Sequence, residues 1–95
     1  MIIKIEASQP AKLEDADNFR AFKLVCASQR ADSVDALAQV GRLDGEHVWV
    51  DPQWIKSNAP AGDEWQAGFR KMVDYAASAG WVDEAGNIRA HIEDI

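Results

Sequence analysis

The residues of this chain best suited to chemistry near neutral pH are its two histidines. Imidazole titrates close to neutrality, so a positioned pair can act as general acid and base. His47 and His91 both fall on expected strands, on the side opposite the apolar residues. If both hairpins join one sheet, we expect the two imidazoles to line a common surface with Trp49. Otherwise each is a solvent-facing residue, which we favour because antiparallel sheets commonly keep one wet face.

The single cysteine is predicted to be structural. Cys26 cannot form an intramolecular disulfide, and it lies far in sequence from both histidines, so no metal-ligand spacing exists. It falls on the apolar face near the end of an expected helix, where the helix dipole disfavours a thiolate. No glycine-rich phosphate loop, Gly-x-Ser-x-Gly, His-Glu-x-x-His or Cys-x-x-Cys motif occurs. We therefore assign no catalytic residue, metal or cofactor and lean against an enzyme.

Four tryptophans in 95 residues favour a contact surface. Tryptophan is enriched at interfaces because it buries a large area while its N–H still reaches a partner. Trp65 belongs to an apolar helix stripe and is expected in the core, whereas Trp49 and Trp54 are harder to bury in so small a domain. The candidate partner-binding residues are Trp49, Trp54, Arg42 and Arg89. The expected partner is a second copy of the chain or another protein.

The first part of the chain is expected to form a strand and two helices. Residues 1–7 are short and rich in isoleucine, which predicts a strand. Residues 15–28 begin with aspartates and continue with apolar residues at helical spacing, which predicts a helix. Its apolar face carries Phe19, Phe22, Val25 and Cys26. A second helix begins at Asp32 or Ser33, either of which can cap it, and stops at a left-handed Gly41.

The remainder is expected to alternate hairpins and helices. Asp44-Gly45 between apolar segments predicts a hairpin, with Arg42, His47 and Trp49 on one face. A short helix is expected over residues 51–59 and a long one over residues 63–79. Residues 80–95 then predict a second hairpin, whose last strand alternates Ile88, Ala90 and Ile92 with Asn87, Arg89 and His91.

This order predicts one α+β domain over residues 1–95. The expected sheet is largely antiparallel, built from the N-terminal strand and the two hairpins, with helices packed on one face. The other face mixes aromatic and cationic side chains on an otherwise acidic chain, which favours a recognition surface; these side chains are Arg42, His47, Trp49, Arg89 and His91.

The charge pattern argues against nucleic-acid and membrane partners. The net charge is −6, and residues 31–95 carry twelve acidic against five basic side chains. Such a surface repels phosphate backbones and anionic lipid. No apolar segment approaches the length of a spanning helix or of a secretory signal, so we expect a cytoplasmic protein.

The order helix, glycine, strand, turn, strand over residues 63–95 resembles winged-helix DNA-binding proteins, without a specific motif. The resemblance implies a recognition helix and a basic wing. Here the helix offers only two cations, Arg70 and Lys71, beside three acidic residues, Asp63, Glu64 and Asp74. The tip of the expected wing is Asp83-Glu84. Carboxylates at these positions disfavour phosphate contacts.

Three functions follow from these observations. The leading prediction is a small non-enzymatic interaction or regulatory module, either self-associating or an accessory subunit. The alternative is a small enzyme or ligand-binding protein that uses His47 and His91 in one pocket. DNA binding of the winged-helix kind is the third and the least favoured, because of the acidic tip.

Overall fold

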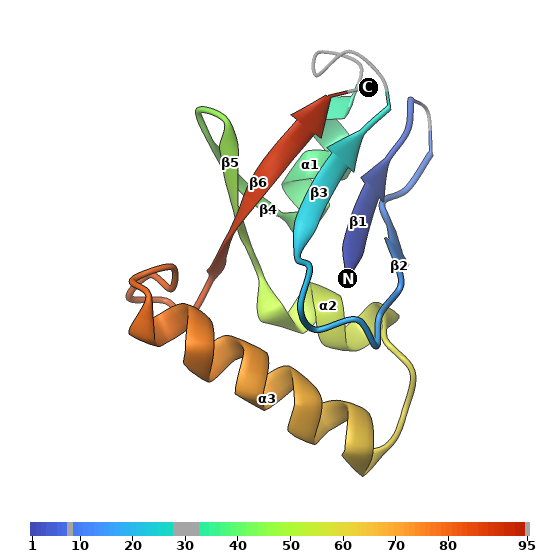
Figure 1. Cartoon of the computed structure of the whole chain (residues 1–95). Helices are drawn as coiled ribbons and strands as arrows, with labels where there is room; N and C mark the ends of the chain where they lie inside the picture. Colours follow the sequence, from blue (N-terminus) through green and yellow to red (C-terminus); the bar gives the residue numbers. More distant parts are fainter. Residues whose placement is uncertain (8, 28–32, 95) are drawn as a thin grey trace.

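The computed structural model describes residues 1–7, 9–27 and 33–94 (Figure 1). The described residues form strands and helices in the order β1 (Ile2–Ile5), β2 (Lys12–Glu14), β3 (Lys23–Cys26), α1 (Val34–Val40), β4 (Gly41–Asp44), β5 (His47–Val50), α2 (Pro52–Asn58), α3 (Asp63–Ser78) and β6 (Ile88–Asp94). The strands make one six-stranded sheet in the order β2-β1-β3-β6-β5-β4.

The sheet is mixed, so the prediction of a largely antiparallel sheet is wrong. β1 pairs with β3 and β3 with β6 in parallel, whereas β2, β4 and β5 join antiparallel. The cause is the path of residues 15–22, which run from the end of β2 beneath β1 and enter β3 at the end where β1 begins (Figure 1). The Met1 amino group holds this segment by donating to the carbonyl oxygens of Asn18 and Ala21, at 2.6 and 2.5 Å.

The predicted helix over residues 15–28 is also wrong over residues 15–27, the part that the structure describes. Asp15 has a φ of 49°, and the N–H of Asn18 donates to its carbonyl oxygen, so the segment begins with a turn. Leu24 and Cys26 are then fully buried between half-buried neighbours, which is the period of a strand. Pairing with β1 and β6 on both sides satisfies the β3 backbone, and this non-local pairing overrides the local helical spacing.

α2 and α3 follow the predicted local signals, whereas α1 lacks the predicted cap and stop. The Asp51 side chain accepts from the N–H of Gln53 at the start of α2, and Gly80 has the expected left-handed φ of 81° after α3. Ser33 precedes α1 without a side-chain cap, and the alternative cap at Asp32 lies outside the described residues. Gly41 is extended rather than left-handed. A side chain there would collide with the Trp49 carbonyl oxygen, so Gly41 permits the close approach of β4 to β5.

The first hairpin forms one residue later than predicted. Asp44 pairs with His47, so Gly45 and Glu46 make the turn. The predicted faces are unchanged, because the pairing partners shift by two residues and side chains alternate with period two. The second hairpin is short: Val82 bridges Ile88, and β6 continues alone to pair with β5 and β3.

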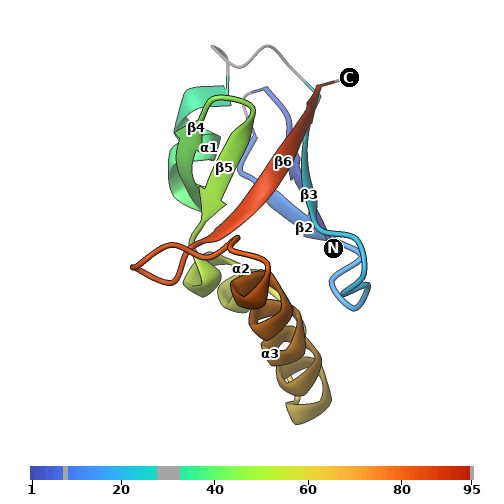
Figure 2. The ribbon, with the colours of Figure 1, turned by 60° about the vertical axis from the view of Figure 1, so that its left-hand side comes forward.

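The core joins buried residues of the strands with residues of all three described helices, including Leu37, Ile55, Trp65 and Phe69. Figures 1 and 2 show α3 beyond the end of the sheet at which β6 begins. The prediction that the helices pack on one face is therefore not confirmed. None of the helices in the described ranges has the length and apolar composition needed to cross a bilayer.

Candidate functional site

The sheet face opposite the buried strand residues carries the cationic and aromatic side chains singled out in the sequence. Across β5 and β6, His47 pairs with His91 and Trp49 with Arg89, and Arg42 lies opposite Trp49 across β4 and β5. Because directly paired residues project to the same side of a sheet, these five residues share one surface. We call it the open face.

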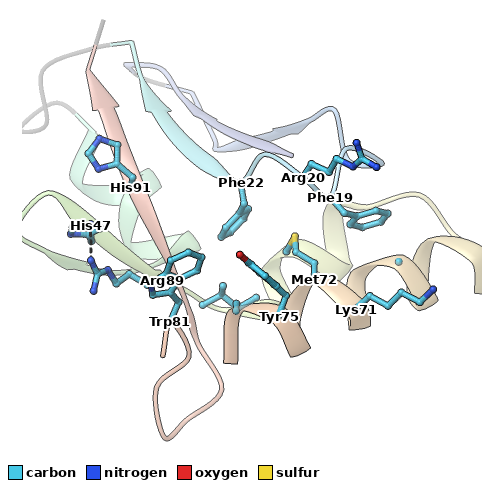
Figure 3. Close-up of a pocket in the computed structure, with 13 residues that line it drawn as sticks. Phe19, Arg20, Phe22, His47, Lys71, Met72, Tyr75, Trp81, Arg89 and His91 are labelled. Carbon is cyan, nitrogen blue, oxygen red and sulfur yellow. Dashed lines mark hydrogen bonds between the residues drawn. The ribbon is translucent and has the colours of Figure 1, made fainter. Parts of the chain in front are cut away.

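The two histidines are in contact. Their ring centroids lie 5.6 Å apart at an interplanar angle of 67°. The Nη2 atom of Arg89 lies 3.1 Å from Nε2 of His47 (Figure 3). A guanidinium can only donate, so Nε2 of His47 accepts, and a neutral His47 carries its proton on Nδ1. His47, His91 and Arg89 thus form one cluster of side chains.

A cavity of about 740 Å³ opens beside this cluster, between α3, residues 19–22 and the β5–β6 end of the open face. It is lined by thirteen described residues, none of which is aspartate or glutamate (Figure 3). Four lining residues are aromatic, three are permanent cations and two are the histidines: Phe19, Phe22, Tyr75, Trp81; Arg20, Lys71, Arg89; His47, His91. Met72, Ala76, Ile88 and Gly68 complete the wall.

The floor on the α3 side is fixed by an aromatic stack. Trp65 stacks on Phe69 with centroids 5.0 Å apart and contacts Phe19 at 6.0 Å. The Trp65 indole N–H donates to the Ala16 carbonyl oxygen at 2.8 Å. Phe19 lies so close to Gly68 that a side chain at Gly68 would collide with its ring. These contacts hold residues 16–19 against α3 and thereby place Arg20 and Phe22 at the cavity.

The opposite rim is built by Tyr75 and Trp81. Their rings meet edge to face at 6.1 Å, and the residues are 67% and 43% exposed. Trp81 is held by the turn that follows it, because its carbonyl oxygen accepts from the N–H of Arg89 at 2.8 Å. Two large aromatic side chains are therefore exposed side by side at this rim.

The Asp83 carboxylate organises that turn. It accepts from the backbone N–H groups of Ala85 and Asn87, at 3.0 and 2.8 Å, and from the Asn87 amide at 3.1 Å. Desolvation acts to raise the pKa of Asp83, but these hydrogen bonds and the charge of Arg42 outweigh it and lower the pKa. The Asp83 carboxylate therefore interacts with the turn and with Arg42, 3.8 Å away, rather than with the cavity.

Lys23 borders the histidine pair but is neutralised. It lies opposite His91 across β3 and β6, and its ammonium donates to Glu93 at 2.7 Å. That hydrogen bond, with the charge of Lys23, lowers the pKa of Glu93. In contrast, none of the described carboxylates lies within ion-pair distance of Arg20, Lys71 or Arg89. The three permanent cations of the cavity lining thus form no ion pair with a described carboxylate.

The other sequence candidates lie outside the cavity lining. The Trp49 indole donates to Asp44 at 3.1 Å, and Trp54 is half-buried on α2 against the core. Arg42 pairs with Asp83. Cys26 is fully buried on β3 rather than on a helix, and its thiol donates to Ser33 at 3.9 Å, which agrees with a structural role.

Sequence reasoning missed the helix side of the cavity. Lys71 and Tyr75 lie four residues apart on α3, outside the apolar stripe that defined the core. That spacing, together with a tryptophan directly after Gly80, was the signal in the sequence for a second side of the helix. Arg20 and Phe22 could not be assigned, because their segment was interpreted as helical.

The polar groups of the cavity lining are hydrogen-bond donors that suit an acid group. Guanidinium, ammonium and imidazole groups donate to acid oxygens, and the aromatic walls bury apolar surface. No group of three metal-ligating side chains occurs among the described residues. Comparison of the chain with family models, with curated proteins and with solved structures finds no match.

Proposed function

We propose that the protein binds a small organic anion in the cavity, with Arg89, His47 and His91 holding an acid group and the aromatic walls holding its apolar part. The observation that carries the proposal is a cavity of about 740 Å³ lined by both histidines and three permanent cations, with no acidic residue among its described lining. Ligand sites typically span roughly 300–1,000 Å³ and combine apolar walls with few polar groups.

Binding is proposed rather than catalysis. The described lining has no serine, threonine, cysteine or carboxylate beside the histidines. His47 accepts from Arg89, which orients both groups for an incoming acid rather than for proton transfer to a neighbouring nucleophile.

The test compares two ligands that share the naphthalene ring system and differ in charge. We expect 2-naphthoate to bind at least about tenfold more tightly than uncharged naphthalene-2-methanol, because a charge-assisted hydrogen bond contributes more than a neutral one. Calorimetry gives the affinities. In amide NMR spectra the Trp81 indole resonance should shift, whereas those of Trp49 and Trp54 should not. Equal affinity for the acid and the alcohol would refute the proposal.

Variants assign the site. The double substitution His47→Ala/His91→Ala should weaken 2-naphthoate binding by about tenfold while leaving the thermal midpoint nearly unchanged, since both side chains project from the open face. Arg70→Ala is the matched control, because Arg70 lies on α3 next to Lys71 but does not line the cavity. Its affinity should stay within about twofold of the wild type.

The interaction module remains the competing prediction. It relies on Trp49, Trp54, Arg42 and Arg89, of which only Arg89 lines the cavity. The partial burial of Trp54 and the hydrogen bond of Trp49 to Asp44 support it less than the cavity supports ligand binding. A cytoplasmic location, the absence of nucleic-acid and membrane partners, and an uncovered second sheet face stay predictions from the sequence.

A further inference from the structure

The permanent cations of the cavity occur in two separate groups. Arg89 lies with His47 and His91 on β5 and β6, whereas Arg20 and Lys71 come from residues 19–22 and α3. Figure 3 shows the first group on one side of the cavity and the second group on the other. A single acid group satisfies only one of them.

The space between the two groups is apolar. Phe22, Met72 and Tyr75 lie between them in Figure 3, and each lines the cavity. A ligand that reaches both cationic ends must therefore cross this region with a segment that tolerates desolvation. Aromatic or hydrocarbon groups do so favourably, in proportion to the apolar area that they bury.

The second cationic group lacks an internal partner. None of the described carboxylates lies within ion-pair distance of Arg20 or Lys71, although Asp74 is only three residues from Lys71 on α3. Both cations line the cavity, and an anion bound beside them would be attracted to each.

We propose that the cavity is specific for an amphipathic dianion, in which an aromatic or hydrocarbon segment separates two acid groups. This inference rests on the proposed function and names its ligand class. Arg89 and the histidines bind one acid group, Arg20 and Lys71 bind the other, and Phe22 and Tyr75 contact the segment between them.

The experiment varies charge number and charge separation on the naphthalene ring. Calorimetry compares naphthalene-2,6-dicarboxylate, naphthalene-2,3-dicarboxylate, 2-naphthoate and naphthalene-2-methanol. We expect the 2,6-diacid to bind about tenfold more tightly than 2-naphthoate, because a second charge-assisted hydrogen bond forms. The 2,3-diacid has the same charge but adjacent acid groups, so it should gain less than about threefold.

Variants at the helix side complete the test. Arg20→Met/Lys71→Met should reduce the affinity of the 2,6-diacid to that of 2-naphthoate, while 2-naphthoate itself changes less than about twofold. Arg70→Met should leave both affinities unchanged. Thermal unfolding checks that each variant is folded, which is expected because the substituted side chains are exposed.

The outcomes separate the two proposals. If the 2,6-diacid binds no more tightly than 2-naphthoate, or keeps its advantage in Arg20→Met/Lys71→Met, the dianion inference is overturned and anion binding stands. If neither acid binds more tightly than the alcohol, the proposed function itself is overturned.

Discussion

At the scale of single residues, Asp83 fixes the turn that follows Trp81 at the rim of the cavity. Its carboxylate accepts two backbone N–H groups in the turn after Trp81, and desolvation of the group is outweighed by these hydrogen bonds, so its pKa is lowered from 3.8. A carboxyl group with a lowered folded-state pKa stabilises the fold above its unfolded pKa. That contribution is lost as the pH falls through the folded pKa, below 3.8.

Asp83→Asn should therefore have two effects on unfolding by urea. The midpoint at neutral pH should fall, because an amide replaces the carboxylate as acceptor, and the change in midpoint between neutral pH and about pH 2 should be smaller than in the wild type. Glu84→Gln, at the exposed neighbouring position, is the control. An unchanged pH dependence in Asp83→Asn would contradict the role assigned to this carboxylate.

At the scale of elements, the contact between α3 and residues 16–22 determines whether the cavity exists. Gly68 faces the Phe19 ring, which in turn lies on Trp65. Gly68→Ala should gain up to about 1 kcal/mol in helix propensity but lose about 1–3 kcal/mol through overpacking against Phe19. We expect a net loss of stability and weaker 2-naphthoate binding, because Phe22, which contacts the aromatic part of the ligand, moves with Phe19.

The control is the same substitution in a Phe19→Ala background. Without the ring, the three closest contacts of an alanine side chain at position 68 are removed. The substitution should then raise the unfolding free energy through helix propensity. Denaturant unfolding of the four proteins gives the coupling energy. Additive effects, or a stabilising Gly68→Ala in the wild type, would show that Phe19 does not pack as described.

Elements with local signals were predictable, and those defined by distant partners were not. Asp51-Pro52, the apolar stripe of residues 63–79 and Gly80 act within a few residues of where they occur, and α2 and α3 follow them. β3 owes its conformation to pairing with Ile2–Ile5 and His91–Asp94, remote in sequence. Its apolar residues fit both a helical and a strand period, so only the fold decides between them.

At the scale of the whole molecule, strand alternation predicted one wall of the candidate site and topology supplied the other. The residues of the open face could be grouped from two assumptions, namely that strand side chains alternate with period two and that both hairpins join one sheet. The observed register brings them together. The helix side required knowing that α3 crosses the end of the sheet and that residues 19–22 reach it. No pattern within either segment carries that information.

The mass of the native protein distinguishes the proposed ligand binding from the interaction module. The edge strands β2 and β4 carry charged residues, which disfavour pairing between the sheet edges of two molecules; they include Lys12, Glu14 and Arg42. The exposed Tyr75 and Trp81 belong to the cavity rim. We therefore expect native mass spectrometry to show a monomer that takes up one equivalent of 2-naphthoate. A dimer at the same concentration that dissociates in Trp49→Ala or Trp54→Ala, with no uptake of the acid, would instead favour the interaction module. A monomer that binds the acid in the wild type but not in His47→Ala/His91→Ala connects the binding to the open face, because an acidic chain has no general attraction for anions.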